Sequence, residues 1–159
     1  MKHFAGLGHA VTGVDRSAQA VTVASTWGET LLADIESGPW PLTVAGELRT
    51  FDAVVVTNYL WRPLFSVMAQ SIAPGGVLIY ETFARDNETV GKPSRPDFLL
   101  EHGELLRAFP LLRVIAYEDG FLDNPDRFVQ RLVAVAPDSL HPPGVAPAHA
   151  PERYLLSLK

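Results

Sequence analysis

The sequence predicts an α/β domain over residues 1–137, built on a mostly parallel sheet that ends in an antiparallel hairpin. Three observations favour this fold class. Short β-branched runs, typical of strands buried on both faces, alternate with segments of helical spacing. A Pro-Gly-Gly turn at residues 74–76 leads directly into one of the runs. Two strand-like runs follow each other at residues 111–117 and 128–136, as in a hairpin.

Composition and charge narrow the class further. With 47% hydrophobic and 19% charged residues the chain is globular, and its apolar runs are far shorter than the roughly 18 residues that span a bilayer. No leader pattern follows Met1, so we expect a cytoplasmic protein with no membrane partner. The lack of cysteine excludes thiolate nucleophiles and cysteine-based metal sites. A net charge of −5 with scattered basic residues argues against nucleic acid.

The first half of the chain predicts two strands around a helix. Residues 9–15 form a β-branched run that reads as a buried strand. Ser17 can cap a helix that runs to about residue 25. Residues 30–36 are a second short apolar run that ends in acidic residues, which predicts the next strand. Residues 40–50 have no clear period, so we expect mostly loop there.

The strand prediction is clearest at residues 51–57, because three consecutive valines without polar alternation indicate burial on both faces. Helical spacing follows over residues 62–73. We expect the Pro-Gly-Gly turn to end that helix and to begin a strand at residues 77–81. The polar stretch at residues 83–96 is too long for a plain connection and is therefore a lid candidate.

The last part of the chain predicts a helix, a hairpin and a tail. Residues 98–109 return to helical spacing, and residues 118–126 are expected to connect the two hairpin strands. Proline is frequent after residue 137, so residues 138–159 read as a tail, with a small Tyr154-Leu155-Leu156 patch that can dock at its end.

Acidic residues stand at the ends of the first two predicted strands, where open parallel sheets bind their ligands. Asp15 offers two acceptor oxygens that can take both hydroxyls of a ribose. Asp34 can accept from an adenine amine while Ile35 covers the ring. Together they favour an adenosine site. The alternative for each aspartate is a cap or turn residue without a ligand.

Four segments together resemble the class I S-adenosylmethionine-dependent methyltransferases, nearest to the small tellurite-resistance-type and general methyltransferase-domain proteins. The segments are Gly-His-Ala-Val-Thr-Gly-Val-Asp-Arg-Ser at 8–17, Ala-Asp-Ile-Glu at 33–36, Phe-Asp-Ala-Val-Val-Val-Thr-Asn-Tyr-Leu at 51–60 and Ala-Pro-Gly-Gly-Val-Leu-Ile at 73–79. The resemblance covers roughly residues 2–136. It implies a Rossmann-like sheet, the cofactor S-adenosylmethionine and a small-molecule methyl acceptor that the sequence does not identify.

The resemblance implies a role for six residues at the cofactor. Asp15 matches the residue that holds the ribose hydroxyls, Arg16 flanks the adenosine, and Asp34 with Ile35 contacts adenine. Asn58 and Tyr59 match the segment beside the methionine part. Acceptor contacts are expected, from their position alone, of Trp61, Glu81, Phe83 and Asn87. No catalytic residue is assigned, because methyl transfer asks mainly for alignment, and the scattered histidines predict no metal site.

The chain departs from the family pattern at its start. Family members open with a strand and a glycine-rich turn ahead of the helix that leads to the Asp15 strand, whereas this chain begins inside that helix. Gly6 and Gly8 stand too close to the strand to substitute. We therefore expect an N-terminally truncated relative with impaired activity. Two alternatives remain open: a non-catalytic remnant that forms a homodimer through its sheet edge, and a nicotinamide-binding dehydrogenase fragment.

Overall fold

The computed structural model describes residues 1–137, and the predicted tail at residues 138–159 with its Tyr154-Leu155-Leu156 patch lies outside the described residues. The chain forms two compact units, Met1–Arg49 and Thr50–Lys159. We call them the first and the second unit and describe each by itself. The α/β class is confirmed, because parallel strand pairs occur in both units and an antiparallel hairpin closes the second.

The first unit contains a parallel strand pair and a capped helix. Strands β1 (Thr12–Asp15) and β2 (Glu29–Leu32) pair in parallel, with the helix α2 (Ala18–Ala24) between them in the chain. Ser17 caps α2, because its Oγ accepts the N–H of Ala20 at 3.3 Å. Both strands and the helix were predicted, and a further helix, α1, covers Lys2–Gly6. The predicted burial of β1 is wrong, since none of its residues is fully buried.

The loop prediction for residues 40–50 is wrong in part. Strands β3 (Thr43–Val44) and β4 (Glu47–Leu48) form a small antiparallel hairpin there. The turn between them places Ala45 at φ 52° and Gly46 at φ 88°. Two successive residues with positive φ match the twist of a hairpin, but alanine rarely takes that conformation, so the sequence carries no clear turn signal.

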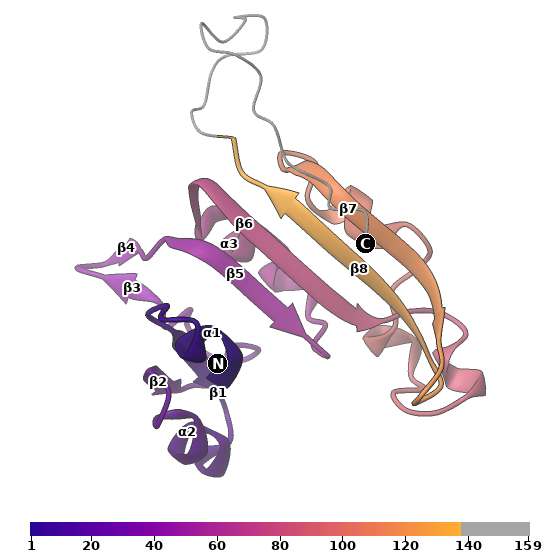
Figure 1. Ribbon diagram of the computed structural model, residues 1–159, viewed down its shortest axis with the longest axis horizontal. Coiled ribbons are helices and arrows are strands. Elements are labelled where there is room, and N and C mark those ends of the chain that lie inside the picture. The colour runs from indigo at the N-terminus through magenta and orange to yellow at the C-terminus, as the bar shows by residue number, and fades with distance from the viewer. Residues whose placement is uncertain (138–159) are drawn as a thin grey trace, which may run out of the picture. The chain divides into compact units, whose positions relative to one another are not determined.

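The second unit is built on a four-stranded sheet in the order β5-β6-β8-β7, which Figure 1 shows side by side. Its strands are β5 (Phe51–Thr57), β6 (Ile72–Phe83), β7 (Arg113–Leu122) and β8 (Arg127–Val135). β5 and β6 are parallel, and β8 pairs antiparallel with both β6 and β7. The predicted terminal hairpin is confirmed. The short helices are η1 (Arg62–Leu64), α3 (Phe65–Gln70), η2 (Asn87–Thr89), η3 (Pro96–Phe98) and α4 (Glu104–Ala108).

The core of the second unit lies on one face of this sheet. Alternate residues of β6 and β8 are at most 1% exposed, namely Leu78, Tyr80, Thr82, Gln130, Leu132 and Ala134. Met68 of α3 and Leu105 of α4 are buried with them. The ring of Phe65 meets that of Tyr80 edge-on, with 6.1 Å between centroids. The period of two in burial shows that the helices α3 and α4 cover a single face.

β5 is not buried on both faces, contrary to the prediction. Val55 is 41% exposed, and within residues 1–137 the strand pairs only with β6, so its other edge is unpaired. Consecutive valines are typical of a central strand, but strand position is set by which segments pair with it. The local sequence therefore predicted the strand correctly and its place in the sheet wrongly.

The Pro-Gly-Gly segment lies inside β6 and does not precede it. The helix α3 ends at Gln70, and β6 begins at Ile72 and not at residue 77. Pairing with β5 then skips from Ile72 to Val77, so residues 73–76 bulge out of the ladder. A Cβ on Gly76 would lie 2.8 Å from the carbonyl oxygen of Ala73, which excludes a side chain there.

Two further predictions are corrected between β6 and β8. The helix expected over residues 98–109 is confined to α4, because Gly103 takes φ 70° and the segment before it is extended, with Leu100 bridging to Ala84. The connection between the two hairpin strands was expected at residues 118–126. It comprises only residues 123–126, because β7 continues to Leu122.

Candidate functional site

The carboxyl ends of β1 and β2 form one rim of the first unit. Asp15 is the last residue of β1 and lies opposite Leu32, the last residue of β2. Asp34 follows two residues later, and the N–H of Ala33 donates to the carbonyl of Asp15 at 3.1 Å. The parallel register thus brings both aspartates, with Arg16 and Ile35 beside them in the chain, to the same end of the strand pair.

The Asp15 carboxylate keeps one oxygen open. Its Oδ1 accepts the N–H of Ser17 at 2.7 Å, which shapes the turn into α2. Its Oδ2 accepts no hydrogen bond from any residue that the structure describes. Because the side chain is exposed, Oδ2 is available to a hydroxyl group of a ligand.

The Asp34 carboxylate is more fully engaged by its own turn. Its Oδ2 accepts the Ser37 hydroxyl at 2.7 Å, and its Oδ1 accepts the N–H of Glu36 at 3.0 Å. The Ser37 hydroxyl, then the Glu36 amide and the nearby Arg16, lower the pKa of Asp34 from its ordinary value. The carboxylate is therefore charged, and any contact with an adenine amine would share oxygens that already hold the turn.

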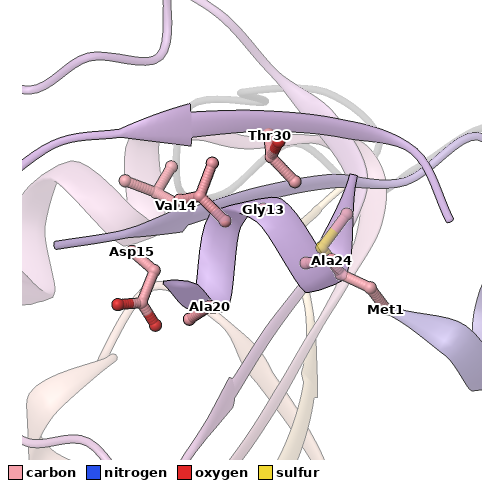
Figure 2. A pocket seen from close by; sticks show the side chains of 8 residues that line it. Met1, Gly13, Val14, Asp15, Ala20, Ala24 and Thr30 are labelled. Carbon is pink, nitrogen blue, oxygen red and sulfur yellow. The ribbon is translucent and has the colours of Figure 1, made fainter. Parts of the chain in front are cut away.

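An open hollow of about 210 Å³ lies beside Asp15, between α2 and the strand pair. Figure 2 shows Asp15 at one end of the hollow and Met1 at the other. Its walls are mostly small and apolar, from Met1, Gly13, Val14, Asp15, Ala20, Val21, Ala24 and Thr30. A Cβ on Gly13 would lie 2.3 Å from the Met1 sulfur, so this glycine leaves room for the methionine. Asp15 thus borders an apolar surface.

The second unit has its own rim, where the segment 58–61 leaves β5. Asn58 takes φ 54°, a conformation asparagine tolerates, and its N–H donates to the carbonyl of Glu81 at 2.9 Å. The Tyr80 hydroxyl donates to the carbonyl of Tyr59 at 3.0 Å. Burial raises the pKa of Tyr80, so its hydroxyl stays protonated and remains a donor. These bonds fix the segment, including the half-buried Trp61, to the end of β6.

Two of the residues expected at the acceptor, Glu81 and Asn87, form hydrogen bonds within the protein. Arg131 donates to Glu81 from Nε at 2.5 Å, within the sheet. The amide of Asn87, 1% exposed, donates to the carbonyl of Pro93 at 3.0 Å and accepts the N–H of Phe128 at 3.1 Å. Asn87 therefore fastens the predicted lid to β8. Phe83 lies at the end of β6, opposite Val129. Contact of Glu81, Phe83 and Asn87 with an acceptor stays a prediction.

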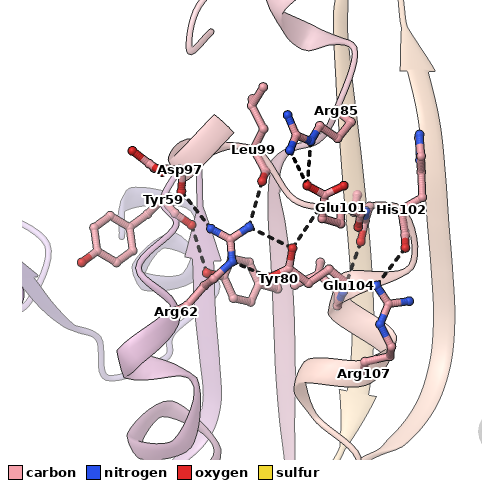
Figure 3. Close-up of polar contacts among 12 residues, drawn as sticks. Tyr59, Arg62, Tyr80, Arg85, Asp97, Leu99, Glu101, His102, Glu104 and Arg107 are labelled. Carbon is pink, nitrogen blue, oxygen red and sulfur yellow. Dashed lines mark hydrogen bonds and ion pairs between the residues drawn. The ribbon is translucent and has the colours of Figure 1, made fainter. Parts of the chain in front are cut away.

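Sequence reasoning missed Arg62, the first residue after this segment. Figure 3 shows its guanidinium on Glu104, with Nε to Oε1 at 2.6 Å and Nη2 to Oε2 at 2.9 Å. The same group donates to the carbonyls of Asp97 and Leu99, each at 2.9 Å. Burial acts to raise the pKa of Glu104, but the hydrogen bond and charge of Arg62, together with the N–H of Glu101, outweigh it and lower that pKa. The partners are 42 residues apart, so no local pattern indicates the pair.

The cofactor residues expected from the sequence fall into two groups in the part of the chain that the structure describes. Asp15, Arg16, Asp34 and Ile35 share the rim of the first unit, and Asn58 and Tyr59 share that of the second. Over residues 1–137 no three His, Asp or Glu side chains are grouped so that they could hold a metal ion. No helix in the same part of the chain is long and apolar enough to cross a membrane.

Comparison with known proteins identifies the fold. The sequence matches no protein-family model and no curated protein. Among solved structures, the chain is similar to TehB from Haemophilus influenzae, with a TM-score of 0.66 and 17% identity over 85% of this chain. It is also similar to a SAM-dependent methyltransferase from Methanosarcina mazei, with a TM-score of 0.61 and 13% identity over 86% of this chain.

A third similar structure is the N-methyltransferase NodS from Bradyrhizobium japonicum, with a TM-score of 0.59 and 15% identity over 80% of this chain. NodS has also been solved in complex with S-adenosyl-L-homocysteine. The chain spans 52% of TehB, 86% of the Methanosarcina protein and 74% of NodS, so it corresponds to about half of the TehB chain. At such low identities the likeness establishes the fold alone.

Proposed function

We propose that this chain, which has the fold of class I S-adenosylmethionine-dependent methyltransferases, binds S-adenosylmethionine and transfers its methyl group to a small-molecule acceptor. The observation that carries the proposal is the Asp15 carboxylate, which ends a parallel strand and keeps Oδ2 open beside an apolar hollow. An exposed carboxylate at the carboxyl end of a parallel strand suits the two hydroxyls of a ribose.

The remaining cofactor residues take the following roles in the proposal. Arg16 flanks the adenosine and Ile35 covers the adenine ring. Asp34 accepts a hydrogen bond from the adenine amine through a carboxylate oxygen that also holds the turn. In the proposal Asn58 and Tyr59 contact the methionine part; their hydrogen bonds to Glu81 and Tyr80 within the second unit support this role by fixing their backbone. The bound cofactor supplies an activated methyl group on a sulfonium. The chain needs to supply alignment, worth on the order of 7–11 kcal/mol, and no strong acid or base.

S-adenosyl-L-homocysteine is the probe that tests this proposal. We expect it to raise the melting temperature of the chain by about 3–6 °C at roughly ten times its dissociation constant. The titration runs into the millimolar range, so that a weak complex is also detected. Reduced nicotinamide dinucleotide is the matched control. A shift with the dinucleotide alone would favour the dehydrogenase alternative, and no shift with either would remove the methyltransferase proposal.

Among residues 1–137 β5 pairs with β6 alone, and this favours a second candidate, a non-catalytic homodimer. The strand contains neither lysine nor proline, the residues that protect natural edges from pairing. A two-fold axis at Val55 would pair two copies antiparallel, with Val54 opposite Val56 and Ala53 opposite Thr57 of the second copy. No like charges then face each other, so the edge is complementary to itself.

Val55→Lys tests this association. The substitution would bring two lysines together on the two-fold axis, so we expect light scattering to show twice the chain mass of 17.4 kDa for the wild type and a single chain mass for the variant. Leu111→Lys is the control, because Leu111 is 83% exposed and lies outside β5. A wild-type chain that stays monomeric in both dilute and concentrated solution would exclude the dimer.

A further inference from the structure

The residues 97–104, which we call the strap, cross the second unit from Arg62 to β7. Arg62 holds one side through Glu104 and the carbonyls of Asp97 and Leu99 (Figure 3). On the other side the N–H of Gly103 donates to the carboxylate of Asp119 in β7 at 3.1 Å. The strap is therefore fastened at both sides of the sheet and is not a loose connection.

The middle of the strap is anchored to the core. Leu99 and Leu100 are fully buried, and the N–H of Leu100 donates to the carbonyl of Phe83 at 3.0 Å. The side chain of Gln130, fully buried in β8, donates to the carbonyl of Glu101 at 2.7 Å. It also accepts the N–H of Leu105 at 3.2 Å. Because the buried Gln130 amide hydrogen-bonds the strap through both its N–H and its oxygen, it fixes the position of the strap on the sheet.

Arg62 links the strap to the candidate site. Its backbone directly follows the segment 58–61, whose Tyr59 carbonyl accepts a hydrogen bond from Tyr80. Its guanidinium donates hydrogen bonds to the strap. Four hydrogen bonds run from its guanidinium to the strap, two of them in a bidentate pair with Glu104, whose side chain is 16% exposed. A bidentate guanidinium–carboxylate pair fixes orientation as well as distance. Movement of the strap would therefore displace Arg62 and, through its backbone, the adjoining segment 58–61.

We propose that Arg62 and Glu104 are a positioning pair that couples the strap to the segment 58–61, which the proposed function assigns to the cofactor. The inference rests on the proposed function for the identity of the site. The coupling itself is a property of the chain without ligand. Arg62 and Glu104 act through the backbone that they hold and touch no reacting atom.

Amide hydrogen exchange on the full chain tests the coupling. We expect Arg62→Gln to speed exchange about tenfold at both Leu100 in the strap and Asn58 in the site segment, because both amides report the linked opening. Arg62→Lys keeps a charge opposite Glu104 but cannot reach both carbonyls, so it should restore part of the protection. Arg85→Gln is the matched control: it removes the Arg85 pair with Glu101 of the same strap and should leave Asn58 unchanged.

Addition of S-adenosyl-L-homocysteine separates positioning from a merely structural role. We expect the ligand to slow exchange at both Asn58 and Leu100 in the wild type, but only at Asn58 in Arg62→Gln. Faster exchange at Leu100 with unchanged Asn58 in that variant would overturn the coupling, as would equal effects of Arg62→Gln and Arg85→Gln. If the wild type does not bind the ligand, the proposed function fails, while exchange in the free chain still decides the coupling.

Discussion

Replacement of Asp15 by asparagine is expected to weaken binding of S-adenosyl-L-homocysteine about 10- to 100-fold. The variant loses charge-assisted hydrogen bonds to the ribose, each worth about 1.5–3 kcal/mol. Asparagine keeps an Oδ1 that can accept the N–H of Ser17, so the turn into α2 is preserved. Isothermal titration calorimetry measures the affinity, and the melting temperature of the free variant checks that the fold is intact.

Glu36→Gln is the control for this experiment, because Glu36 is an exposed acid near the same rim and has no assigned role. We expect its affinity to stay within about twofold of the wild type, as for surface substitutions away from special features. Undiminished binding by Asp15→Asn would contradict the assignment of the ribose contact. The fold would stand, since it rests on the strand order and on the similar solved structures.

Truncation of Leu78 to alanine should lower the free energy of unfolding by about 2–5 kcal/mol. Leu78 is fully buried at the centre of β6, where the surrounding side chains cannot close the cavity that the alanine leaves. Chemical denaturation with urea measures the loss. An equal midpoint for the variant and the wild type would contradict the position of the core on this face of the sheet.

Val55→Ala is the matched comparison in the neighbouring strand. Because Val55 is 41% exposed, we expect the substitution to cost less than about 1 kcal/mol. Burial of β5 on both faces, as the sequence predicts, would make the two losses similar. The pair of measurements therefore decides between the pattern of the sequence and the exposure in the structure, unless a second copy covers β5, which the mass measurement on Val55→Lys would reveal.

The rim of the first unit was predictable from local signals. An acidic residue at the end of each short apolar run marks the carboxyl end of a strand, and parallel pairing brings such ends together. Asp15 and Asp34 meet this expectation in the register of β1 and β2. The pairs Glu81–Arg131, Asn87–Phe128 and Arg62–Glu104 were not predictable, because the two residues of each pair are more than thirty positions apart in the chain.

The sequence by itself determined the strands at 12–15, 29–32 and 51–57, the capped helix after Ser17, the terminal hairpin and the family resemblance, because these follow from periodicity, capping and turn residues that act over a few positions. The tertiary structure alone decided that β5 is an edge strand, that Gly76 lies in a bulge and that Arg62 holds the strap. The physical reason is that strand pairing, burial and ion pairs depend on which distant segments meet in space.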